Sequence, residues 1–114
     1  MTNKADTPNH RDDIRIVLTT CGTTEQAQAI ATDLLSAELV ACVNLLPPMQ
    51  SIYRWQGEIC NETEVQLVIK TREQHVEAIK RWLNEHHPYE TPEVLVLSVA
   101  DASLAYHQWI KEVC

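Results

Sequence analysis

Two adjacent histidines, His86 and His87, are the residues of this chain with the clearest capacity for chemistry. Pro88 follows them, and a proline disfavours the helical conformation of the residue before it. We therefore expect a helix to close at His86 and His87 to be extended, which frees the second ring to turn toward the first. Neutral imidazole is a good ligand for copper, zinc and nickel, so this junction is a candidate metal site.

The same pair also has a simpler structural explanation. An imidazole in the last turn of a helix can hydrogen-bond a terminal carbonyl, and it complements the negative end of the helix dipole. From the residues alone, both explanations of His86 and His87 stay open. The other histidines, His10, His75 and His107, are expected to be solvated surface residues.

The cysteines show no recognisable metal-binding pattern. They are Cys21, Cys42, Cys60 and Cys114, and no two of them form a CxxC pair or a zinc-finger spacing. Reduced thiols in the cytosol are the simplest account of such a set.

Composition narrows the class of protein. A chain of 114 residues is one domain, and its net charge of −7 argues against nucleic acid while being compatible with cation partners. The polar stretch 1–13 is predicted to be a flexible tail in front of a single domain at 14–114. No apolar run approaches membrane-spanning length, and no export signal is indicated, so we expect a cytoplasmic protein.

The first half of the domain predicts a strand, a helix and a long hairpin. Residues 14–20 are β-branched and suit a strand. Thr23 and Gln26 resemble a capping box that opens a helix. One buried helical stripe is then predicted for Ala27, Ile30, Ala31, Leu34 and Leu35.

The hairpin is the least ordinary of these elements. A strand at 41–53 is interrupted by Pro47 and Pro48, which predicts a bulge or a bend on an edge. The return strand after Gly57 carries Glu58, Glu62 and Glu64, interpreted as one solvated face. Tyr53 and Trp55 flank the turn and suit either a ligand cleft or a subunit contact. So long a hairpin needs its edges covered, and another subunit is the simplest cover.

The second half predicts a helix over 72–86, a strand over 94–99 and a short helix over 102–113. The 72–86 helix is expected to bury Val76, Ile79 and Leu83, and the continuous apolar strand is expected to be covered on both faces. The resulting order is β-α-β-β-α-β with a terminal helix, which favours an α+β, ferredoxin-like sandwich with a long hairpin.

Several segments together resemble the CutA family of divalent-cation-tolerance proteins. They are Ala41-Cys42-Val43-Asn44, Ser51-Ile52-Tyr53-Arg54-Trp55-Gln56-Gly57-Glu58, Lys70-Thr71, His86-His87-Pro88-Tyr89, Pro92-Glu93 and the pair Tyr106 and Trp109. The resemblance covers almost all of the chain from Ile14 to Trp109. It implies a ferredoxin-like subunit in a tight cytoplasmic homotrimer, with the hairpin pairing across subunits.

The resemblance also implies copper binding through one cysteine near the end of the first strand and the two histidines. His86 and His87 match those two positions. The cysteine position falls on Thr19, whereas the chain has a cysteine two residues later, Cys21. Residues i and i+2 of a strand face the same way, so the predicted ligands are His86, His87 and Cys21, with the Thr19 position or water as alternatives for the third. Without a thiolate, such a site favours Cu(II).

These observations predict a divalent-cation-binding homotrimer, chiefly for copper, that acts in metal-ion tolerance or homeostasis. The alternative is a trimeric signalling or scaffold protein similar to PII proteins, which holds a small anion or nucleotide between subunits. The chain has only two glycines and no glycine-rich phosphate loop, which weighs against nucleotides. No nucleophile–base pair is recognisable, so we do not expect an enzyme.

Overall fold

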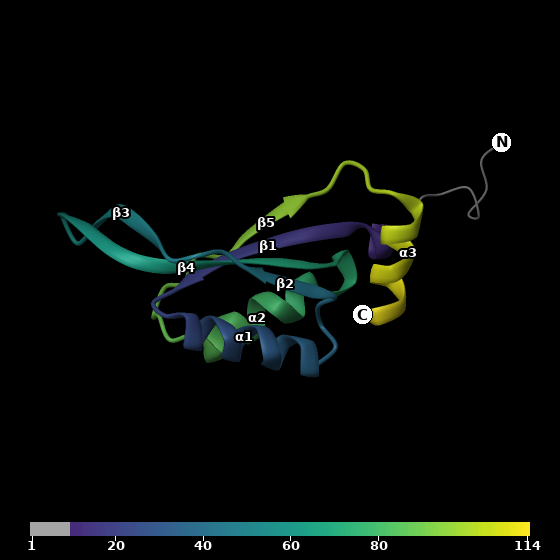
Figure 1. The fold of residues 1–114 in the computed structure, drawn as a ribbon, viewed down its shortest axis with the longest axis horizontal. Helices are drawn as coiled ribbons and strands as arrows, with labels where there is room; N and C mark the ends of the chain where they lie inside the picture. Colours follow the sequence, from purple (N-terminus) through teal and green to yellow (C-terminus); the bar gives the residue numbers. More distant parts are fainter. Residues whose placement is uncertain (1–9) are drawn as a thin grey trace.

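The computed structural model describes residues 10–114, which fold into one antiparallel sheet with the two long helices on one face and the C-terminal helix at one end (Figure 1). In chain order the elements are η2 (His10–Asp12), β1 (Ile14–Cys21), α1 (Thr24–Ser36), β2 (Cys42–Leu45), β3 (Met49–Trp55), β4 (Glu58–Arg72), η3 (Glu73–His75), α2 (Val76–His86), β5 (Leu95–Ser98) and α3 (Leu104–Val113). The strand order is β2-β4-β1-β5, and β3 pairs with the outer part of β4. The predicted ferredoxin-like arrangement is confirmed.

The hydrophobic core lies between the sheet and the two long helices. Strands β1 and β4 contribute alternate residues, and each helix contributes one stripe; the fully buried large side chains include Val17, Leu34, Leu67, Ile69, Ile79 and Leu83. The stripe predicted for α1 is confirmed except at Leu35. That side chain is 44% exposed, because it lies beside the stripe and turns toward solvent at the helix end.

Helix α1 begins as its sequence predicts. The Thr23 hydroxyl accepts a hydrogen bond from the Gln26 backbone N–H at 3.1 Å. The Gln26 side chain accepts from the backbone N–H of Gly22 at 3.1 Å, one residue before the position that a capping box would use. Both bonds satisfy donors at the turn that joins β1 to the helix.

The two prolines produce the expected interruption. Leu45 pairs with Leu67, whereas Met49 pairs with Glu64, so four steps along one strand oppose three along β4. This is a bulge of one extra residue, and it divides the predicted strand into β2 and β3. Beyond it, β3 and the outer part of β4 form a hairpin that projects past the end of the sheet (Figure 1).

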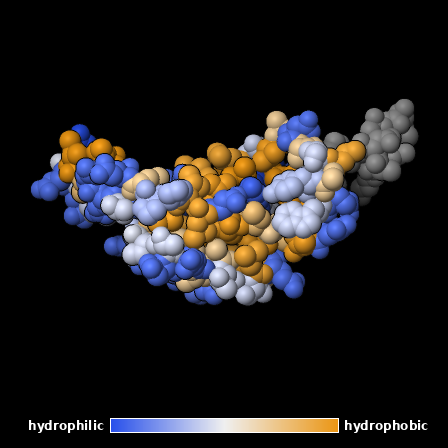
Figure 2. Space-filling view, in the orientation of Figure 1, coloured by the Kyte–Doolittle hydropathy of each residue, from blue (hydrophilic) through white to orange (hydrophobic). Residues whose placement is uncertain are grey.

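Strand β5 differs from its prediction. It was expected to be covered on both faces, but it lies at the edge of the sheet beside β1, and Leu95, Val96 and Leu97 are 51%, 40% and 44% exposed. An unbroken apolar run indicates that both faces of a strand avoid water. In the single chain, the described residues do not cover both faces of β5. In Figure 2 an apolar surface spreads across the middle of the molecule, with another patch at the hairpin tip.

The ends of the domain are tied together. Residues 1–9 of the predicted tail lie outside the described residues, and 10–12 form the short helix η2. Asp12 accepts a hydrogen bond from Arg72 at 2.5 Å, and its carbonyl accepts one from His107 of α3 at 2.7 Å. Among residues 10–114, no helix has the length and apolarity needed to cross a bilayer.

Candidate functional site

His86 is the last residue of α2 and lies on the surface of the protein. Its Nδ1 donates a hydrogen bond to the Trp82 carbonyl, one turn earlier, at 3.0 Å. Its ring stacks on the Trp82 indole with 4.7 Å between centroids. Because Nδ1 carries the proton in this bond, Nε2 keeps a lone pair, and this nitrogen can ligate a cation.

His87 follows as an extended residue with ψ of 140°, as Pro88 predicts. Its ring is only 8% exposed. Nε2 donates to the Thr20 carbonyl at 2.8 Å, and Nδ1 accepts from the Tyr89 backbone N–H at 2.9 Å. Both ring nitrogens are therefore engaged in a neutral imidazole, and burial lowers the pKa of His87 below its ordinary value.

Cys21 ends β1 and is fully buried. Its thiol donates to the Thr23 carbonyl at 3.5 Å. Burial raises the pKa of this thiol, and the charge of Glu64 raises it further, which disfavours the thiolate that a metal requires. Thr19 faces the same core, and its hydroxyl has no hydrogen-bond partner among the described residues.

The structure thus separates the three predicted ligands. Cys21 and His87 lie close to one another, since His87 bonds the carbonyl of the residue before Cys21. His86 turns to the solvent side of the same junction. Within residues 10–114, no group of three or more His, Cys, Asp and Glu side chains is placed to hold a metal ion. In this conformation, His86 is the one predicted ligand with an available donor atom.

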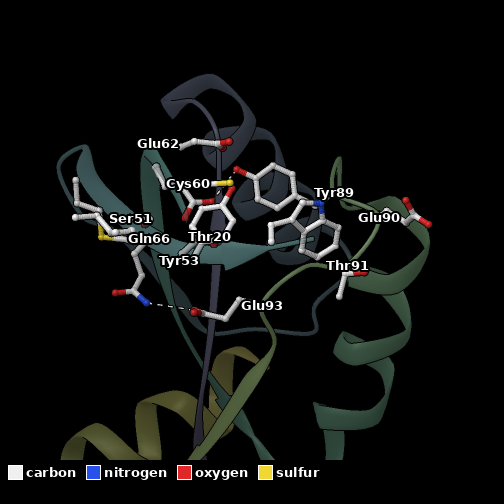
Figure 3. A pocket seen from close by; sticks show the side chains of 14 residues that line it. Thr20, Ser51, Tyr53, Cys60, Glu62, Gln66, Tyr89, Glu90, Thr91 and Glu93 are labelled. Carbon is white, nitrogen blue, oxygen red and sulfur yellow. Dashed lines mark hydrogen bonds between the residues drawn. The ribbon is translucent and has the colours of Figure 1, made fainter. Parts of the chain in front are cut away.

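A cleft of about 650 Å³ lies next to this junction, between the hairpin and the loop that follows α2 (Figure 3). Every charged side chain that lines it is a carboxylate: Glu62, Glu64, Glu90 and Glu93. Figure 3 shows Glu62 and Glu93 at opposite ends of the cleft and Glu90 at its outer edge. The lining residues include no lysine, arginine or histidine, so the potential inside the cleft is negative.

The hairpin supplies the apolar wall of the cleft. Side chains of directly paired residues lie on the same face of a sheet. Ser51 pairs with Glu62, Tyr53 with Cys60, and Trp55 with Glu58. Tyr53 and Trp55 consequently face the cleft beside the carboxylates of β4, while their other expected role, a subunit contact, stays a prediction.

Tyr89 links the histidine junction to the cleft. Its hydroxyl donates to the Glu64 carboxylate at 2.8 Å, and its backbone N–H is held by His87. Desolvation and the neighbouring carboxylate raise the pKa of the Tyr89 hydroxyl. Glu64 is 8% exposed, so its prediction as part of a solvated strand face is wrong. The sequence offered no signal for this bond, which spans 25 residues.

Comparison with known proteins identifies what the sequence and the fold are similar to. The family model of the CutA1 divalent ion tolerance protein matches residues 15–113. The divalent-cation tolerance protein CutA of Yersinia pestis (strain Pestoides F) is 42% identical over 95 residues, which are 83% of this chain and 80% of that protein.

Solved structures give the same result. CutA from Synechococcus elongatus PCC7942 has a TM-score of 0.85 and 42% identity, covering 92% of this chain and 93% of that one. The protein described as the periplasmic divalent cation tolerance protein CutA of Archaeoglobus fulgidus has a TM-score of 0.85 and 29% identity, covering 88% and 97%.

Proposed function

The chain belongs to the CutA1 divalent ion tolerance family, and on that premise we propose that it is a cytoplasmic homotrimer that binds divalent cations, chiefly Cu(II). Reversible binding would contribute to metal-ion tolerance or homeostasis. The observations that carry this proposal are a cleft whose charged lining is entirely acidic and, at the end of α2, an exposed imidazole with a free nitrogen. The negative potential raises the local concentration of cations, and the imidazole supplies a first ligand.

Capture begins at His86, since its Nε2 is the accessible donor. His87 can join only if its ring releases a hydrogen bond to Thr20 or Tyr89. Cys21 would have to leave the core and lose its proton, so oxygen ligands or water are better suited to complete the coordination. Nitrogen and oxygen donors favour Cu(II) over Cu(I).

The homotrimer is supported by the uncovered apolar surface. Leu95, Val96 and Leu97 form an exposed edge strand, and Ile52 and Ile59 on the hairpin are 68% and 73% exposed. A surface of this kind in one chain indicates a protein–protein contact, and an open strand edge can pair with another chain. Further copies of the same chain are the occupants that we propose.

Calorimetric titration with Cu(II) tests the site. We compare the wild type with His86→Ala, His87→Ala and the double variant, and use His10→Ala as a control that removes an exposed histidine elsewhere. Affinity should fall most strongly for variants that lack His86, and it should weaken at acidic pH, because protons compete for the imidazole. Unchanged affinity in the double variant, or an equal loss in the control, contradicts the proposal; circular dichroism checks that each variant is folded.

The PII-like alternative is not favoured by the same cleft. A nucleotide or small anion would meet four carboxylates there and no basic side chain. The negative charges of such a ligand and of these carboxylates would repel each other.

A further inference from the structure

The C-terminal helix α3 is joined to the segment before β1 through a single residue, Asp12. The Asp12 carboxylate pairs with Arg72 at the end of β4 at 2.5 Å, and with Lys111 of α3 at 3.9 Å. The Asp12 backbone carbonyl accepts a hydrogen bond from the His107 ring at 2.7 Å. His107 and Lys111 are four positions apart, so they lie on the same side of α3. Asp12 therefore connects one side of α3 to a strand of the sheet.

Arg72 extends these contacts to the end of α3. Its guanidinium also donates to the backbone oxygen of Cys114, and Nε2 of His75 lies 3.1 Å from the same oxygen. The last carbonyls of a helix lack partners within the helix, and basic side chains complement the negative end of its dipole. Because Arg72 contacts both Asp12 and Cys114, the helix is held at its side and at its end.

The contacts of Asp12 lie where solvent screens them only in part. The side chains of Arg72 and Asp12 are 12% and 28% exposed. Isolated ion pairs on the surface contribute little, whereas a partly buried charge with several partners is screened less by water and salt. The apolar part of the attachment is Ile110, which is fully buried in a small cluster with Ile14 and Ala41. Polar and apolar contacts thus act together on the same helix.

Helix α3 also reaches the side of the sheet opposite the two long helices. Ile16 of β1 pairs with Lys70 of β4 and with Leu97 of β5, so these three side chains lie on one side of the sheet. The Lys70 Nζ lies 5.9 Å from the centroid of the Tyr106 ring of α3. Leu97 belongs to the surface for which we propose a subunit contact. The position of α3 therefore sets one border of that surface, at Tyr106.

We propose that Asp12 acts as a latch, which holds α3 against the sheet and thereby fixes the border of the subunit contact at Tyr106. When the Asp12 carboxylate is removed, α3 separates from the sheet more often, while the core between the sheet and the two long helices stays folded. The latch is a property of the subunit itself. Only its consequence for assembly rests on the proposed homotrimer.

Amide hydrogen exchange measured by mass spectrometry tests the latch. We compare the wild type with Asp12→Ala and with Asp12→Asn, which keeps the size of the side chain but loses its charge. The amides of α3 should exchange about tenfold faster in Asp12→Ala, because a charge-assisted hydrogen bond stabilises the attached helix by about this factor. The amides of α1 should exchange at the wild-type rate in both variants.

A matched variant separates the specific contacts of Asp12 from the loss of one negative charge. Glu77→Ala removes the carboxylate of an exposed ion pair with Lys80 on α2. Exchange in α3 should be unchanged in this control. Light scattering over a dilution series measures assembly: dissociation should shift to about tenfold higher concentration in Asp12→Ala and should stay unchanged in Glu77→Ala.

Two results would overturn the latch. They are wild-type exchange of α3 in both Asp12 variants, and an equal acceleration in α1, which would show a general loss of stability. Faster exchange of α3 with unchanged assembly would overturn the role of α3 at the border of the subunit contact. A wild-type mass of one protomer would contradict the homotrimer instead, and the exchange measurement would still decide whether Asp12 holds α3.

Discussion

The two faces of the sheet are built from alternate residues of the same strands, yet only one of them is covered by the helices of the same chain. On β4, Val65, Leu67 and Ile69 face the helices and are 2%, 0% and 0% exposed. On the opposite face and at the β5 edge, large apolar side chains such as Leu97 stay in contact with water. The comparison teaches that one chain completes its own core on one side only, and that the other side stays open in the single chain, as the proposed homotrimer requires.

The largest expected effect is on the free energy of unfolding, and it comes from the face of the sheet that the helices cover. Leu67→Ala should lower the free energy of unfolding by about 3–5 kcal/mol, because it leaves a cavity in a core that cannot collapse freely. Chemical denaturation followed by circular dichroism measures this loss. A loss below about 1 kcal/mol would mean that this face is less tightly packed than its burial indicates.

A charge on the side of the sheet that no helix covers should weaken subunit association rather than folding. Leu97→Glu places a carboxylate where we propose a subunit contact, and it should weaken association by roughly 100-fold, since a buried charge without a partner is costly. Light scattering of the eluted protein measures the mass. Leu35→Glu is the matched control, because Leu35 is also 44% exposed but lies on the helical side. Equal masses for the two variants would remove the distinction between the faces.

The smallest expected effect lies at the junction between the helical layer and the cleft. Burial lowers the pKa of His87, so the unfolded chain takes up a proton before the folded one does as the pH falls below about 6.5. The stability contributed by neutral His87 is complete above that pH and is lost toward the lower pKa of the folded state, by at most about 1.4 kcal/mol per pH unit.

The variant His87→Gln removes this titration. Between pH 7 and pH 5, its free energy of unfolding should therefore fall less steeply than that of the wild type. Urea denaturation at several pH values measures both slopes. Parallel slopes would show that His87 is not the residue that makes this junction sensitive to acid.

The elements could be predicted from the sequence because their signals are local. The stripe of α1, the cap at Thr23 and the extended conformation of His87 each depend on residues within a few positions. The exposure of β5 was predicted wrongly for a related reason. The pattern Leu95, Val96, Leu97 reports that a strand avoids water, but it cannot tell whether the cover comes from the same chain.

The candidate site was predicted in part. Family resemblance drew attention to the junction at His86 and His87, which stays a prediction as a metal site, and the contacts of its residues depend on partners far away in the chain. His87 bonds Thr20 across 67 residues, and Tyr89 bonds Glu64 across 25. No periodicity encodes such pairs, and the convergence of Glu93 with the carboxylates of β4 likewise exists only in the folded chain.

The bulge at Pro47 and Pro48 has a consequence for the sign of the charge in the cleft. Before the bulge, even-numbered residues of β2 share a face of the sheet with even-numbered residues of β4. After the bulge, odd-numbered residues of β3 share that face with the even-numbered residues of β4. Removing a single residue there would restore the original parity and would turn Arg54 inward in place of Tyr53 or Trp55. The odd–even phase of a short loop therefore decides whether this hollow attracts cations or meets them with a guanidinium group.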